Sequence, residues 1–231
     1  MSENLIVDGV IISRTDTTKF LGIHIDEHLS FRNHINYIKG KVARGLGILY
    51  KCRPYFTENT LKSLYNSFIY PYFTYCVEVW GSAHKTYLDP LEKQQKRAIR
   101  VITNSRKYDH TDPLFLRLHL LRLKEIYLYC SQLFMYKHRH NMLPIIFSQF
   151  FERHNDIHDY PTRINDLYRV PFVQKSLSYR YIWRVGPKLY NYFFDKIPLD
   201  ISYPCYKNYL KNYVIKNDID QLYDSLFKPE E

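Results

Sequence analysis

Four cations follow one another at helical spacing between residues 90 and 104, an arrangement suited to binding a polyanion. They are Lys93, Lys96, Arg97 and Arg100. The apolar residues of this segment fall on the opposite face: Leu91, Ala98, Ile99 and Ile102. Residues three and four apart share one side of an α-helix, so one side would pack while the other presents the cations. Such a row can neutralise phosphates along a groove, whereas a merely solvated face usually mixes charge signs. We therefore predict that this row binds phosphates.

Four histidines raise the question of a metal site. They are His138, His140, His154 and His158. Histidines four apart on a helix can share a ligand face, but no glutamate stands between these as a general base. A glycine-rich phosphate loop and a G-x-S-x-G elbow are also missing from the sequence. We predict no metal ligand and no catalytic residue, and we interpret the histidines as polar surface.

Tyrosine occurs 23 times, and several copies alternate with cations near residue 180. This short stretch contains Tyr179, Arg180, Tyr181, Trp183 and Arg184. Aromatic rings beside cations can stack on nucleobases while the cations hold the backbone. The same rings also pack well at the rim of a core. We favour packing, because nothing in the sequence shows that these rings are exposed.

The elements that must position these residues are mostly helices after an N-terminal hairpin. Residues 5–26 alternate apolar and polar in two runs around a turn-rich centre, which predicts one antiparallel hairpin. From Phe31 the apolar spacing changes to that of a helix ending near Pro54. Thr57 can cap a second helix, which should break or kink at Pro71.

Further helices are expected along the rest of the chain. Asp89 and Pro90 predict a helix start, with the end near Asn104. Asp112 repeats this signal before a longer helix that ends by Pro144. Residues 151–186 have weak periodicity and should be irregular. We expect a short helix over 186–194, a last helix capped by Ser202, and frayed residues beyond Asn217.

Composition favours a folded chain with polyanionic partners. Lys and Arg outnumber Asp and Glu by 33 to 23, a formal net charge of +10, which favours nucleic acid as a partner. The four cysteines show no paired metal spacing and are interpreted as reduced core residues. No leader and no uncharged apolar stretch of membrane-spanning length is visible, so we expect no membrane association and a cytoplasmic or nuclear location.

Seven segments, taken in order, resemble the region after the palm in non-LTR retrotransposon reverse transcriptases of the Jockey and CR1 kind. They are KFLGIHID at 19–26, the stretches 31–56 and 61–83, LEKQQKRAIRVITNS at 91–105, the stretch 110–138, HDYPTRIND at 158–166 and GPKLYNYFFDKIP at 186–198. No single segment is specific, but their order and spacing are. The resemblance covers nearly the whole chain, from Leu5 to Val214.

The resemblance implies roles for two sets of residues. In that family the hairpin leaving the palm grips the primer end, and the following helices form the thumb that holds template and growing strand. Lys19, Phe20, Leu21 and Gly22 match the primer-grip hairpin, and the basic row of 93–100 precedes the family's Ile-Thr-Asn-Ser segment. The implied partners are RNA, DNA or an RNA/DNA hybrid, together with the missing palm portion of the polymerase.

The chain departs from the family at the catalytic carboxylates. Polymerases of this kind hold two metal ions with paired carboxylates, which the family supplies from a Phe-Ala-Asp-Asp turn and an earlier aspartate. No adjacent Asp-Asp pair occurs in this sequence. We expect Mg²⁺ only in the intact polymerase and no cofactor in this chain.

The resulting expectation is a mainly α protein with three parts. Residues 1–30 would be a primer-grip-like hairpin at the palm exit, 31–144 a thumb-like helical bundle, and 145–231 a smaller, irregular and helical C-terminal extension. The predicted function is that of a reverse transcriptase fragment that binds template–primer duplex through its basic helix. Two alternatives stay open: a helical module that docks an acidic protein, and a remnant of a decayed element without function.

We predict that the purified 231-residue chain does not extend an annealed primer. The reason is that the carboxylates needed to hold two metal ions are not in the sequence. A primer-extension assay with Mg²⁺ or Mn²⁺ checks this. Metal-dependent incorporation by the purified chain would show the prediction to be wrong.

Overall fold

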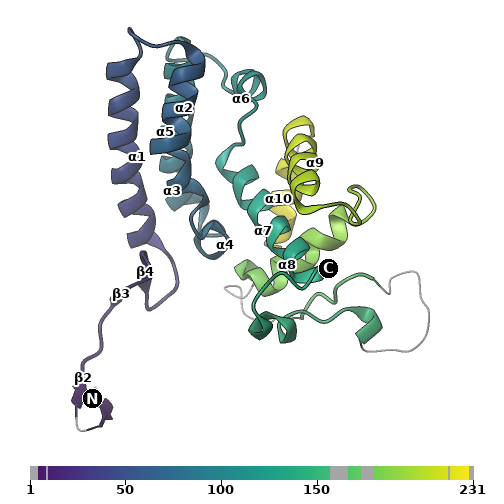
Figure 1. Ribbon diagram of the computed structural model, residues 1–231. Coiled ribbons are helices and arrows are strands. Elements are labelled where there is room, and N and C mark those ends of the chain that lie inside the picture. Colours follow the sequence, from purple (N-terminus) through teal and green to yellow (C-terminus); the bar gives the residue numbers. More distant parts are fainter. Residues whose placement is uncertain (1–4, 9, 157–165, 173–178, 218, 229–231) are drawn as a thin grey trace.

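Helices make up most of the structure, so the prediction of a mainly α fold is confirmed. The computed structural model describes residues 5–8, 10–156, 166–172, 179–217 and 219–228. The α-helices are α1 (Arg32–Cys52), α2 (Glu58–Phe68), α3 (Tyr70–Thr74), α4 (Val77–Trp80), α5 (Lys85–Ile102), α6 (Asp112–Leu118), α7 (Leu123–Arg139), α8 (Ile182–Phe193), α9 (Tyr203–Lys216) and α10 (Asp220–Leu226). In Figure 1, α1, α2 and α5 stand side by side, while α8, α9 and α10 gather around α7.

The N-terminal residues form two separate hairpins, so the prediction of one hairpin over 5–26 is wrong. Strand β1 (Leu5–Val7) pairs with β2 (Val10–Ile12), and β3 (Thr17–Phe20) pairs with β4 (Ile23–Asp26), both antiparallel. Each run turns back on itself instead of pairing with the other. The second turn has two residues, Leu21 and Gly22, both with positive φ (45° and 85°), the conformation that suits a tight hairpin. A short loop also costs less closure entropy than a long one.

The first two predicted helices and the break between α2 and α3 are confirmed. The expected apolar stripe of α1 is buried throughout: Ile35, Ile38, Val42, Leu46 and Leu49. The Thr57 side chain accepts a hydrogen bond from the Thr60 N–H at 3.4 Å and so caps α2. Helix α2 ends at Phe68, and Pro71 lies in the first turn of α3. These features follow from local spacing and from the missing N–H of proline.

Helix α5 begins at Lys85, before the Asp89 cap that the sequence suggested. His84 is the N-cap residue, and Pro90 lies inside the helix, where its missing N–H removes one backbone hydrogen bond. Leu88, only 4% exposed, packs into the core as part of the added turn. Burial of the added turn therefore outweighs the local cap signal at Asp89.

The C-terminal helices pack more fully than the sequence suggested. Helix α8 starts at Ile182, four residues before the expected Gly186. The expectation of fraying beyond Asn217 is wrong, because α10 follows and buries Tyr223 and Leu226. All four cysteines are free, and Cys205 is exposed, so the core interpretation is wrong for that residue.

Gln95 joins α5 to two other parts of the bundle. Its side-chain amide donates to the Tyr65 hydroxyl of α2 and to the Leu121 carbonyl, both at 2.9 Å. Its side-chain oxygen accepts from the Leu123 N–H at the start of α7, again at 2.9 Å. The residue is 1% exposed, so these bonds lie in the core. They fix which face of α5 points inward.

Replacing Gln95 with leucine should lower the free energy of unfolding by roughly 2–4 kcal/mol, because buried partners lose their hydrogen bonds. Urea denaturation followed by circular dichroism measures this. Gln221→Leu, at an exposed position of α10, is the matched control and should change stability little. Equal stability of the two variants would contradict the bridging role of Gln95.

Candidate nucleic-acid interface

The basic row of α5 lies opposite its buried side. Lys93 and Arg97 are exposed, and Lys96 and Arg100 are half-buried. The four apolar residues expected on the other face, Leu91, Ala98, Ile99 and Ile102, are all buried. The amphipathic arrangement inferred from the spacing is therefore present. Whether it binds phosphate is a separate question of charge and geometry.

Lys96 has different surroundings from the rest of the row. It borders a small cavity that is also lined by Glu92, Arg122, Lys124 and Asp220. Burial raises the pKa of Glu92, against the opposing effect of the nearby Lys124 and Lys96 ammonium groups. We expected only positive charges on this face of α5, and that expectation is wrong around Lys96, where Glu92 and Asp220 lie nearby.

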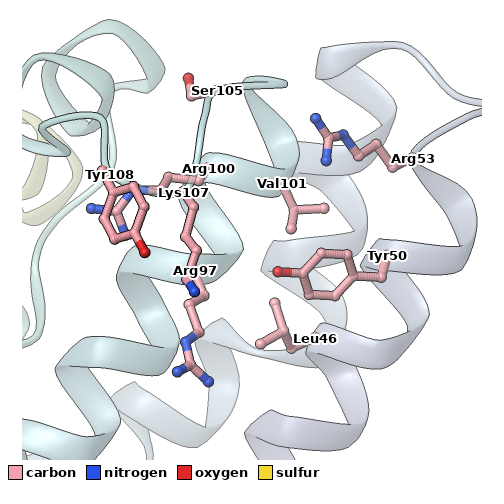
Figure 2. A pocket seen from close by; sticks show the side chains of 9 residues that line it. All are labelled: Leu46, Tyr50, Arg53, Arg97, Arg100, Val101, Ser105, Lys107 and Tyr108. Carbon is pink, nitrogen blue, oxygen red and sulfur yellow. The ribbon is translucent and has the colours of Figure 1, made fainter.

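Arg97 and Arg100 instead line a cavity of about 440 Å³ between α5, the C-terminal half of α1 and the loop after α5. Its lining residues are Leu46, Tyr50, Arg53, Arg97, Arg100, Val101, Ser105, Lys107 and Tyr108. Figure 2 shows Arg53 and Tyr50 reaching in from α1, with Tyr108 on the far side beside Arg100. Four of the nine residues are cations and none is acidic. The cavity is thus suited to an anionic ligand.

Hydrogen bonds hold two of these guanidinium groups in place. The Arg100 Nε and Nη2 atoms donate to the Asp109 carbonyl at 2.9 and 2.8 Å, and Arg53 donates to the Asn104 side chain. The carboxylate of Asp109 accepts from the Arg106 backbone N–H at 2.7 Å. A guanidinium has five N–H donors, so both arginines keep donors for a ligand while losing little side-chain freedom on binding.

Further cations lie on α1, on α5 and in the loop after α5, and the sequence reasoning missed those of the α1 run. No Asp or Glu occurs in residues 28–57 or in 93–108. These two runs carry Arg32, Lys39, Lys41, Arg44, Lys51, Arg53, Lys93, Lys96, Arg97, Arg100, Arg106 and Lys107. Helices α1 and α5 pack along each other, which brings the runs together. We call the twelve residues the cationic face. The cations of α1 could have been found from the sequence, because the thirty residues 28–57 contain no Asp or Glu.

Apart from Lys96, which has Glu92 nearby, the cationic face is not neutralised by the protein itself. Within the described residues, no Asp or Glu forms an ion pair with any of its twelve members. By contrast, cations elsewhere do have acidic partners, such as Arg117 with Glu58 at 2.5 Å and Lys124 with Asp220 at 3.9 Å. Unpaired like charges repel one another, so this face has its charge free for an external polyanion.

The four primer-grip-like residues lie near the other end of α1. Lys19 and Phe20 end β3, and Leu21 and Gly22 form the turn. The Tyr75 hydroxyl donates to the Leu21 carbonyl at 2.6 Å, so the turn is fastened to the residue after α3. Phe20 and Leu21 keep 62% and 74% of their surface exposed.

The structure does not bring these residues beside the basic row. Lys19 lies 5.9 Å from the ring of Tyr37, in the N-terminal half of α1, whereas the cavity is bordered by Arg53. Sixteen residues of helix separate Tyr37 from Arg53, a rise of about 24 Å.

Of the candidate histidines, His138 is half-buried and hydrogen-bonded, whereas His140 is exposed. The ring nitrogens of His138 hydrogen-bond to the Tyr168 hydroxyl at 2.7 Å and the Phe147 carbonyl at 3.1 Å. In the described part of the chain, no three potential metal ligands come together, while His158 lies outside it. In the stretch 179–184 the rings of Tyr179, Tyr181 and Trp183 are half-buried, and Trp183 packs against the core. Arg184 is 2% exposed, and its guanidinium lies 4.4 Å from the Tyr179 ring centroid. None of the helices in the described ranges has the length and apolar character needed to cross a membrane.

Comparison with known proteins relates the chain to RNA-directed DNA polymerases of mobile elements, so the resemblance expected from its motifs is confirmed. It is 26% identical over 122 residues to a probable RNA-directed DNA polymerase from transposon BS of Drosophila melanogaster, covering 52% of this chain and 14% of that protein. It is also 26% identical over 109 residues to the RNA-directed DNA polymerase from mobile element jockey of Drosophila funebris, covering 46% and 12%. The matched region is thus a small part of each relative. No protein-family model matches the chain, and neither does any solved structure.

The unpaired charge of the cationic face should make stability depend on salt. Raising NaCl from roughly 0.1 M to 1 M shortens the Debye length from about 10 Å to about 3 Å and screens the repulsion. The Tm of the wild-type chain should rise by about 2–4 °C more than that of Lys93→Glu/Arg97→Glu, in which the repulsion is already reduced. Calorimetry at both salt concentrations measures the difference, and identical salt responses would contradict it.

Proposed function

We propose that the chain binds the sugar-phosphate backbones of a template–primer duplex, either RNA/DNA hybrid or double-stranded nucleic acid, across the cationic face of α1 and α5. The observation that carries the proposal is that two acid-free runs lie on neighbouring helices and that their cations form no ion pair with any described Asp or Glu. Similarity to RNA-directed DNA polymerases of mobile elements supports nucleic acid as the polyanion. An acidic protein surface is the competing partner.

The geometry favours recognition of the backbone rather than of base sequence. Arg53, Arg97, Arg100 and Lys107 line one concave site, and cations such as Arg44 and Lys51 extend the charge along α1. Guanidinium groups match phosphate oxygens in paired N–H contacts. An A-like duplex is read mainly by its shape and backbone, because its major groove is too narrow for side chains to read. Binding should therefore be insensitive to sequence.

Within a polymerase, this body would serve as the part that holds the duplex. We propose that residues 31–144 act as the thumb-like bundle, with the β3–β4 hairpin beside the primer strand and 145–231 as an extension. Polymerisation and Mg²⁺ binding would then be carried out by a catalytic palm, which would be the protein partner of this chain. We expect the chain to be in the cytoplasm or nucleus, where such partners occur.

Charge reversal of the exposed part of the row tests the proposal. Lys93→Glu/Arg97→Glu should weaken binding of a fluorescent RNA/DNA hybrid at least about tenfold and lower the slope of log K against log salt by about two units. Fluorescence anisotropy at several salt concentrations measures both quantities. Lys196→Glu/Lys228→Glu makes the same change in net charge at exposed positions after α8 and α10. This control should bind with nearly wild-type affinity.

Two results would overturn the proposal. One is equal loss of affinity in the two double variants, which would mean that only net charge matters. The other is failure of the wild-type chain to bind any hybrid in low salt while it still binds an acidic protein. The substitutions avoid Arg100, whose bonds to the Asp109 carbonyl stabilise the loop, so misfolding should not explain a loss.

A further inference from the structure

A second cavity, of about 430 Å³, lies where the β3–β4 turn meets α1 and the bend between α2 and α3. Its walls include Gly22, His34, Tyr37, Phe68, Tyr72 and Tyr75. No acidic residue lines it, and the volume falls within the range of pockets that hold small organic ligands. None of these aromatic residues has a role in the phosphate binding proposed for the cationic face.

The aromatic walls are open to solvent. Tyr37, Phe68 and Tyr75 are 38%, 44% and 52% exposed, although they lie close to one another around the cavity. The bond from the Tyr75 hydroxyl to the Leu21 carbonyl fixes that ring against the hairpin. Gly22 has φ +85°, and a Cβ there would meet the Tyr75 ring at 3.6 Å. Exposed aromatic faces of this kind stack readily on flat ligands.

Two ammonium groups flank one of these rings. The Lys19 Nζ lies 5.9 Å, and the Lys41 Nζ 5.2 Å, from the centroid of Tyr37. One comes from the hairpin and the other from α1, so the two approach the ring from different elements. Rings that stack on bases, next to cations that hold the backbone, form the usual platform for an unpaired nucleic-acid strand.

His34 adds a neutral polar group to the wall. It is 2% exposed, and burial together with nearby His24 lowers its pKa to about 4, so the ring carries no charge at neutral pH. Its Nδ1 accepts from the His24 N–H at 3.4 Å, which leaves the proton on Nε2. That N–H has no partner among the described atoms. The Nε2 atom is itself buried from solvent, so a ligand in the cavity does not reach it without rearrangement of the wall.

We propose that this cavity holds one unpaired nucleobase of a bound strand, stacked on Tyr37 and flanked by phosphates on Lys19 and Lys41. The inference rests on the proposed function, because the cationic face is what brings the strand. A base inside a duplex is already stacked and paired, so the cavity selects an overhang or a frayed end. The rise along α1 between Tyr37 and Arg53 is about 24 Å, which corresponds to roughly seven nucleotides of one strand at about 3.4 Å each. The duplex and its unpaired end therefore fit along the same helix.

Binding of end-labelled hybrids tests this assignment. The probes are a blunt hybrid, the same hybrid with a one-nucleotide 2-aminopurine overhang, and one with an abasic overhang. The wild-type chain should bind the 2-aminopurine probe about fivefold or more tighter than the abasic probe and quench its fluorescence. Tyr37→Ala should remove both effects without changing affinity for the blunt hybrid. Tyr37→Phe, which keeps a ring, should retain them.

A matched control separates stacking at this cavity from general loss of tyrosine. Tyr55→Ala removes a ring that is 82% exposed in the connection between α1 and α2, and it should behave as wild type. Equal affinity of the wild-type chain for the 2-aminopurine and abasic probes, with salt-dependent binding intact, would overturn the base cavity and leave the proposed function standing. If the wild-type chain bound none of the hybrids, not even the blunt one, both the base cavity and the proposed function would be overturned.

Discussion

The orientation of α5 depends on the buried side chain of Gln95. Its amide donates to the Tyr65 hydroxyl and the Leu121 carbonyl and accepts from the Leu123 N–H. One side chain therefore joins α5 to α2 and to the start of α7. A helix rotated about its axis would leave these groups unsatisfied in the core, at a cost of about 1–3 kcal/mol each. The face that carries Lys93 and Arg97 is thereby held toward solvent, next to α1.

The packing of α1 against α5 has an electrostatic cost that a polyanion would remove. Twelve cations come from the two acid-free runs, and none forms an ion pair with Asp or Glu among the described residues, although Glu92 lies near Lys96. A protein selected for stability alone would place Asp or Glu among them, as it does around Arg117 and Lys124. The guanidinium of Arg100 is held in place by its two hydrogen bonds to the Asp109 carbonyl.

Helix α1 gives the candidate interface its length. Its C-terminal end borders the cationic cavity, and its N-terminal half borders the aromatic cavity beside the β3–β4 turn. The two sites differ in chemistry, since guanidinium groups line one and aromatic rings line the other. A rigid helix keeps the two sites at a constant separation.

Local pattern was enough to predict several elements of this protein. The stripe from Ile35 to Leu49, the Thr57 cap, the break at Pro71 and the amphipathic character of α5 depend only on neighbours a few residues away, and all are present. Other features needed contacts between distant segments. The start of α5 at Lys85 depends on burial of Leu88, and α10 is held by Tyr223 and Leu226 in the core. Lys96 borders the same small cavity as Asp220, which comes from the far end of the chain. The cationic and aromatic cavities likewise join residues that are tens of positions apart. Sequence spacing determines which residues share a face, and only packing decides what that face meets, because desolvation and charge act through space rather than along the chain.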